Sequence, residues 1–122
     1  MHNFRNLNVW KKSKQLVKEI YSTTSKFPNN EDFVLSSQMR RAVISISSNI
    51  AEGSGRSGKK DFLKFLDMAL GSAFELESQL EISIDLRYLD RNTFKELKLK
   101  IQEVQSMIIG KNAYHRKGIQ EQ

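Results

Sequence analysis

The residue pattern with the clearest chemical potential is a glycine-rich basic loop from Gly53 to Lys59. Its residues fit both the GxGxxG and the GxxxxGK spacing of loops that bind nucleotide phosphates. Such a phosphate-binding loop follows a buried strand, and a Ser or Thr after its lysine ligates Mg²⁺. Here Lys60 takes the place of that hydroxyl, and the residues before the loop repeat with a helical period. We therefore interpret the loop as a turn between helices and give a nucleotide-dependent enzyme little weight.

A line of polar residues precedes this loop at spacings of four, three and four, on one face of an expected helix. A catalytic role for its charged members would need a nucleophile or a second carboxylate, and the sequence places neither beside them. Asn49 falls on the apolar face of the same helix, so it needs a hydrogen-bond partner if it is buried. We interpret these residues as a structural polar network that fixes helix register or a subunit contact: Arg41, Ser45, Ser48, Asn49 and Glu52.

Metal chemistry is not indicated by the ionisable residues. His2 and His115 lie near opposite ends of the sequence, and neither has a neighbour at ligand spacing. Di-metal helical bundles carry a Glu-x-x-His repeat, which this chain lacks. We therefore expect no metal, no cofactor and no catalytic residue, and a protein that is not an enzyme. The sequence has no cysteine, no secretory signal pattern and no apolar run of membrane-spanning length, so a cytoplasmic location is expected.

The elements that must position these residues are four amphipathic helices, expected near residues 6–26, 31–53, 59–88 and 92–112. Pro28 blocks continuation of the first, and Asn29 and Asn30 could cap the second. The fourth is expected to begin after Asp90 or Asn92, with a capping box from Thr93 to Glu96. Short turns between such helices predict an all-α, up-down-up-down antiparallel four-helix bundle. The chain is expected to form one domain over residues 1–122, with a frayed tail at 113–122.

The second and third helices carry more apolar residues than one buried stripe needs. The third has apolar side chains on both flanks of its core stripe, and the second has some on its outer side. Helices that are apolar on two sides are usually buried on two sides, although scattered apolar surface residues are also common. We predict a self-association surface that includes Ile44, Ala51, Leu63, Leu70 and Phe74.

Basic residues give the chain a formal net charge of +6, and this charge attracts polyanions. Cations recur on one flank of the first expected helix and on one flank of the fourth. Others lie at the amino end of the third, where free backbone N–H groups and the helix dipole favour anions. The candidate nucleic-acid contacts are Lys11, Lys14, Lys18, Arg56, Lys59, Lys60, Arg91, Lys95 and Lys98.

A family resemblance rests on ordered blocks that run through nearly the whole chain. They include Leu7-x-Val-Trp10, Phe27-Pro28, Gln38-Met-Arg-Arg-Ala42, Ser48-Asn-Ile-Ala-Glu-Gly53, Asp61-Phe-x-x-Phe-Leu66 and Glu75-Leu-Glu-x-Gln-Leu80. In these blocks the chain resembles the bacterial four-helix-bundle family encoded in intervening sequences of 23S ribosomal RNA genes, often labelled S23 ribosomal protein. The resemblance implies a ring-like homopentamer. It also implies a relation to accessory proteins of diversity-generating retroelements, which are thought to bind nucleic acid and a reverse transcriptase.

Three functional hypotheses follow from the sequence. The first is a non-enzymatic homo-oligomer that binds structured RNA or DNA through its basic surface. The second is a protein-interaction scaffold whose charge is incidental, with a reverse transcriptase among the conceivable partners. The third is the nucleotide-dependent enzyme, which depends on the incomplete loop pattern alone. No aromatic-interleaved RNA-binding signature is present, so sequence-specific recognition of bases is not expected.

Overall fold

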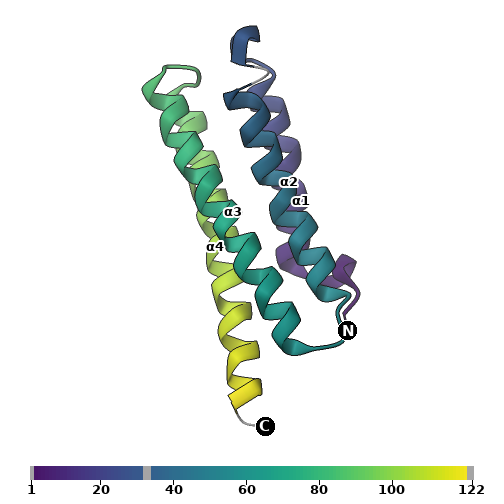
Figure 1. Cartoon of the computed structure of the whole chain (residues 1–122). Helices are drawn as coiled ribbons and strands as arrows, with labels where there is room; N and C mark the ends of the chain where they lie inside the picture. Colours follow the sequence, from purple (N-terminus) through teal and green to yellow (C-terminus); the bar gives the residue numbers. More distant parts are fainter. Residues whose placement is uncertain (1, 32–33, 121–122) are drawn as a thin grey trace.

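Four α-helices make up most of the part of the chain that the structure describes, and each runs antiparallel to the one before it (Figure 1). The computed structural model describes residues 2–31 and 34–120. The helices are α1 (Asn8–Thr24), α2 (Leu35–Ser54), α3 (Lys59–Asp85) and α4 (Arg91–Gln120), with short 3-10 helices η1 (Phe4–Asn6) and η2 (Asn29–Glu31). The described residues contain no strand, and the expected all-α four-helix bundle is confirmed. None of the described helices combines the length and apolarity that crossing a bilayer needs.

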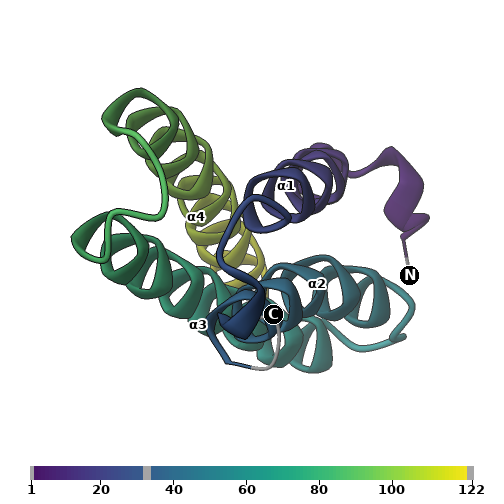
Figure 2. The same cartoon turned by 90° about the horizontal axis from the view of Figure 1, so that it is seen from above.

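The core lies along the bundle axis, where each helix contributes fully buried aliphatic side chains. Ile20 of α1, Ile46 of α2 and Leu76 of α3 are all 0% exposed, as is Ile101 of α4. These residues belong to apolar series spaced three and four apart, so the helical period itself turns them to one side. The most extensive helix pairing is that of α2 with α3. Viewed from above, the two hairpins, α1–α2 and α3–α4, lie side by side (Figure 2).

The end of α3 is set by a residue in the left-handed region. Arg87 has φ 63°, the backbone N–H of Tyr88 donates to the Ser83 carbonyl at 3.0 Å, and that of Arg87 donates to Ile84 at 3.0 Å. This pair of bonds is a Schellman motif, which caps the last turn of a helix and usually uses glycine at the left-handed position. The helix therefore ends at Asp85, three residues before the expected end at 88.

The start of α4 is capped by Asp90. Its Oδ1 accepts a hydrogen bond of 2.7 Å from the backbone N–H of Thr93. That bond holds the pKa of Asp90 below its usual value, because it favours the carboxylate. Of the two expected starting points, Asp90 is correct. The predicted capping box is wrong, because Thr93 lies inside the helix. Its backbone N–H donates to the capping residue Asp90, and its own side chain is not the cap.

The second helix begins later than expected. Asn29–Glu31 form the separate 3-10 helix η2, and α2 starts at Leu35. The expected start at residue 31 is thus wrong, and residues 32 and 33 of the expected helix lie outside the described residues.

The predicted frayed tail is also corrected, since α4 continues to Gln120. Contacts with α3 hold this extension. Asn112 donates to Asp67 at 2.6 Å, Arg116 pairs with the same carboxylate at 3.2 Å, and His115 packs on the ring of Phe62. A sequence pattern that counts only apolar residues misses a helix end that is held by polar and aromatic contacts.

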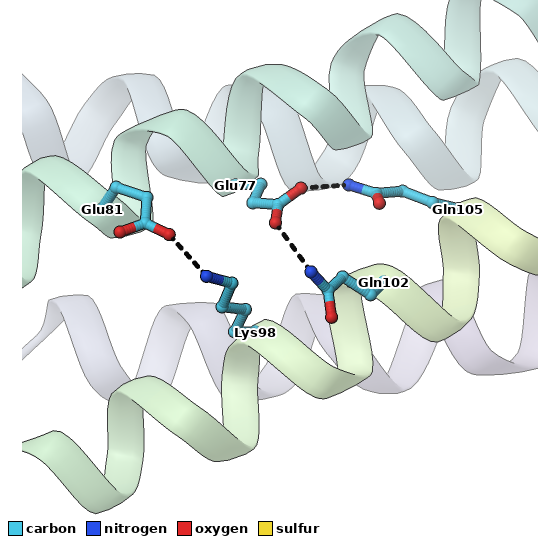
Figure 3. Close-up of polar contacts among 5 residues, drawn as sticks. All are labelled: Glu77, Glu81, Lys98, Gln102 and Gln105. Atoms are coloured by element: carbon cyan, nitrogen blue, oxygen red, sulfur yellow. Dashed lines mark hydrogen bonds and ion pairs between the residues drawn. The ribbon is translucent and has the colours of Figure 1, made fainter.

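Between α3 and α4 the bundle carries a ladder of polar contacts (Figure 3). The carboxylate of Glu77 accepts from Gln105 at 2.8 Å and from Gln102 at 3.1 Å. One turn further along α3, Glu81 pairs with Lys98 at 2.9 Å. Gln105 is only 7% exposed, so its amide would be costly to bury without this acceptor. The ladder fixes the register of the two antiparallel helices.

Candidate nucleic-acid interface

The outward face of α1 carries a basic groove, which we define by Arg5, Trp10, Lys11, Lys14 and Lys18. These residues, with Gln15, line a hollow of about 630 Å³. Short local structure brings Arg5 to it. Asn3 accepts a hydrogen bond from the backbone N–H of Arg5 at 3.1 Å and so caps η1, and the Phe4 ring meets Trp10 edge-on with centroids 4.8 Å apart. The predicted lysine flank of the first helix thus forms one surface.

The charges of the basic groove are not neutralised within the chain. Among the described residues, none of its four cations has an ion pair with a carboxylate. Two of them lie over aromatic rings instead, Lys14 at 5.3 Å from the Trp10 centroid and Arg5 at 4.5 Å from that of Phe4. In proteins that bind single-stranded nucleic acid, free cations contact the phosphates, and an aromatic ring beside them stacks on a base. The groove is therefore suited to a polyanion with exposed bases.

The predicted basic flank of α4 is weaker than expected. Lys98 donates to Glu81 in the polar ladder, and this hydrogen bond raises the pKa of Lys98. Its charge is therefore paired with Glu81 at the bundle surface, which corrects its assignment as a free nucleic-acid contact. Arg91 and Lys95 are exposed and make no ion pair within the described part of the chain.

The cations of the glycine-rich loop also differ in whether they are paired. Arg56 pairs with Glu52 at 2.9 Å and lies over the Phe65 ring at 4.9 Å, so these contacts hold its side chain in place. Lys59 and Lys60 are exposed in the first turn of α3 and have no ion pair in the described residues. The loop joins two helices, as interpreted from the sequence.

Two histidines that seemed separate in sequence meet beside this loop. The rings of His2 and His115 lie 5.8 Å apart, since a bundle with an even number of antiparallel helices brings both chain ends to one side. With six other residues they line a second cavity of about 320 Å³: Arg56, Ser57, Gly58, Lys59, Phe62 and Tyr114. The topology could have predicted this meeting, whereas separation in sequence argued against it. In the described residues, no three histidines or carboxylates gather as a metal site would need.

The expected polar network on α2 is smaller than predicted. Ser45 bonds to Ser72 of α3 at 2.8 Å, and Asn49 donates to the Ser45 carbonyl at 2.8 Å. Glu52 belongs to the separate pair with Arg56. Arg41 and Ser48 are exposed and form no side-chain hydrogen bond within the described residues, so they do not belong to a network within one chain, and their role in a subunit contact stays a prediction. Each lies about one helical turn from Ser45 along α2, and both side chains are exposed.

The expected self-association surface also changes. Leu63 is 6% exposed and belongs to the protein's own interior, while Leu70 packs against the core and Ala51 is half-buried. Ile44 and Phe74 are 41% and 51% exposed. These two side chains are the members of the predicted set that remain free to contact another copy.

Comparison with known proteins identifies the family. Residues 5–110 match the model of the 23S rRNA-intervening sequence protein family. The chain belongs to this family. A crystal structure of a family member with unknown function, from the S23 ribosomal protein family of Bacteroides thetaiotaomicron VPI-5482, superposes with a TM-score of 0.80 at 27% identity. The match covers 86% of this chain and 95% of that one. No curated protein matches the chain.

Proposed function

We propose that the protein is a non-enzymatic, homo-oligomeric bundle that binds RNA or DNA through the basic groove of α1. The observation that carries the proposal is the clustering of Arg5, Lys11, Lys14 and Lys18 around Trp10 without a carboxylate partner among the described residues. Keeping four like charges together is unfavourable unless an anion offsets them. The groove offers backbone contacts and one stacking surface, so it suits structured RNA or single strands without sequence preference. Such a partner agrees with a cytoplasmic location.

Repetition in an oligomer would strengthen this binding. A single groove makes only a few phosphate contacts, whereas several copies on one nucleic acid convert later contacts into intramolecular ones. The pentamer implied by the family resemblance would present the groove five times. The exposed Ile44 and Phe74 are the proposed contacts between copies.

Replacing Lys11, Lys14 and Lys18 together by Gln is expected to weaken RNA binding and to reduce its salt dependence. Each neutralised duplex phosphate contributes about 0.9 to the slope of log K against log salt, so the slope should fall by up to about 2.7. The chain has a single tryptophan, Trp10, whose fluorescence would report binding at the groove directly.

A matched control removes the same charge from other exposed positions, Lys26, Lys64 and Lys117. We expect this control to keep nearly the full slope. If both triple variants lose binding equally, the attraction is diffuse and the groove is not the site. If wild-type protein at about 50 mM salt, where such contacts are strong, shows no binding, the scaffold hypothesis replaces this one.

The oligomer is tested by charging its proposed contact. Phe74→Asp is expected to reduce the mass measured by light scattering to that of one chain, because a carboxylate in an apolar contact would be buried without a partner. Leu99→Asp serves as control, since Leu99 is 68% exposed on α4. A monomeric wild-type protein at micromolar concentration would refute oligomerisation. Dispersal by the control variant alone would place the contact on α4.

A further inference from the structure

The cavity beside the glycine-rich loop contains a buried imidazole with unsatisfied hydrogen-bonding groups. His115 is 5% exposed, and neither of its ring nitrogens has a hydrogen-bond partner among the described residues. Its ring contacts are aromatic, with Phe62 at 4.9 Å and Tyr114 at 5.3 Å between centroids. Buried polar atoms in proteins nearly always have a partner. No described residue satisfies His115, and both nitrogens have almost no exposed surface, so the ring must turn for a ligand in the cavity to reach them.

The amino end of α3 contributes to the same cavity. Gly58 is the N-cap residue of this 27-residue helix and has no side chain to bond the N–H groups of the first turn. Free N–H groups at the positive end of a helix dipole bind anions. Both Gly58 and Lys59 line the cavity together with Arg56 and His115. The helix end and the buried imidazole are thus two independent features of the same cavity.

The charge around this cavity is positive. Lys59 of α3, Arg56 of the loop and Lys111 of α4 supply it, and His2 of the N-terminal segment adds to it when its ring is protonated. Among the described residues, the carboxylates at this end of the bundle include Glu52, which pairs with Arg56, Asp61 in the first turn of α3, and Asp67, which pairs with Arg116. None of these three lines the cavity.

We propose that this cavity binds a dianionic phosphate group, held by the first-turn N–H groups of α3 and by Lys59 and Arg56, with His115 as a further donor. The group is either free phosphate or the 5′-phosphate of an RNA end. In the second case the inference deepens the proposed function and rests on it. The groove on α1 would then hold the strand, and the cavity would recognise its terminus.

Protonation gives the site a pH signature. Burial, and then the charges of Lys111, His2 and Lys59, lower the pKa of His115, while burial and Lys111 lower that of His2. Both rings are therefore mainly neutral at about pH 7 in the free protein. A bound dianion favours the protonated ring, so binding takes up a proton and affinity falls as pH rises from about 6.5 to 8. Below about pH 6 a 5′-phosphate itself gains a proton, which weakens binding again.

The first experiment titrates the full chain with inorganic phosphate by calorimetry at two pH values. We expect one phosphate per chain, with affinity reduced about tenfold or more in Lys59→Gln and in His115→Phe. Lys64→Gln is the matched control on α3, because Lys64 is exposed and does not line the cavity. His115→Phe should also reduce the dependence on pH, and what remains comes from His2 and from the titration of phosphate itself. The proposal is overturned if millimolar phosphate produces no binding heat, or if both variants behave like the control.

The second experiment compares a short RNA carrying a 5′-phosphate with the same RNA carrying a 5′-hydroxyl. A preference of about tenfold for the phosphorylated RNA, lost in Lys59→Gln, identifies the RNA end as the ligand. Equal affinity for both RNAs, with phosphate still bound, identifies free phosphate. If phosphate binds and neither RNA does, the nucleic-acid function fails while this site stands. If RNA binds and phosphate does not, this site fails while the nucleic-acid function stands.

A spectroscopic readout protects the test against a misfolded His115 variant. In wild-type protein, the imidazole C–H resonances of His115 and His2 should titrate at higher pH when phosphate is present. Unchanged titration of both rings in saturating phosphate would contradict the proposal without any substitution.

Discussion

Truncation of Ile101 to alanine is expected to lower the free energy of unfolding by about 2–5 kcal/mol. Ile101 lies in the middle of α4, is 0% exposed and belongs to the central core cluster. The cost has two parts, the lost transfer of buried methyl and methylene groups out of water and the cavity that the rigid surroundings leave unfilled. Urea unfolding followed by circular dichroism would measure it.

Leu99→Ala is the control for this prediction. Leu99 lies two residues away on the same helix and is 68% exposed, so its truncation removes a similar volume without forming a cavity. We expect a change within about 0.5 kcal/mol. Equal losses at both positions would contradict the assignment of the buried face of α4.

Replacing Gly53 by alanine is expected to destabilise the protein by about 1–2 kcal/mol, although alanine normally favours a helix over glycine. A Cβ at this position would lie 2.7 Å from the Cβ of Phe65 and 3.0 Å from Cδ1 of Phe62. The Phe65 Cβ is attached to the backbone and cannot swing aside, so the end of α2 must move away from α3. This movement also displaces Phe62, which packs on His115, so phosphate affinity should fall as well.

Gly110→Ala provides the opposite case within α4. A Cβ there has no atom within 4 Å, so only the helix-forming advantage of alanine remains. This variant is expected to gain about 0.5–1 kcal/mol. A stabilising Gly53→Ala would show that α2 and α3 are more loosely packed than their geometry indicates.

The sequence predicted the parts of the fold that depend on residues close together in the chain. The helical period placed Ile46 and Leu76 in the core, and Pro28 separated the first two helices. The alignment of Lys11, Lys14 and Lys18 on one face is likewise a local property, and the structure places them in one groove. Each of these expectations needs only the rise and twist of a helix.

What could not be predicted depends on the register between helices. Lys98 was expected to be free because its partner, Glu81, lies on a different helix, and sequence does not fix which turn of α3 faces which turn of α4. Leu63 was expected on the surface for the same reason, since packing by a neighbouring helix decides its burial. The meeting of His2 with His115 joins the two ends of the chain.

The contact between α1 and α4 is less extensive than that of α1 with α2 or of α3 with α4, and ion pairs that are at least partly exposed cross it. Lys12 pairs with Glu103 at 3.2 Å, and Lys100 pairs with Glu19. Exposed pairs of this kind contribute about 0–1 kcal/mol each and weaken as salt screens them. Native-state amide exchange should therefore find α1 in the first cooperative unit to open, ahead of α2 and α3. The helix proposed to meet the nucleic acid is thus also the one freest to adjust its position during the encounter.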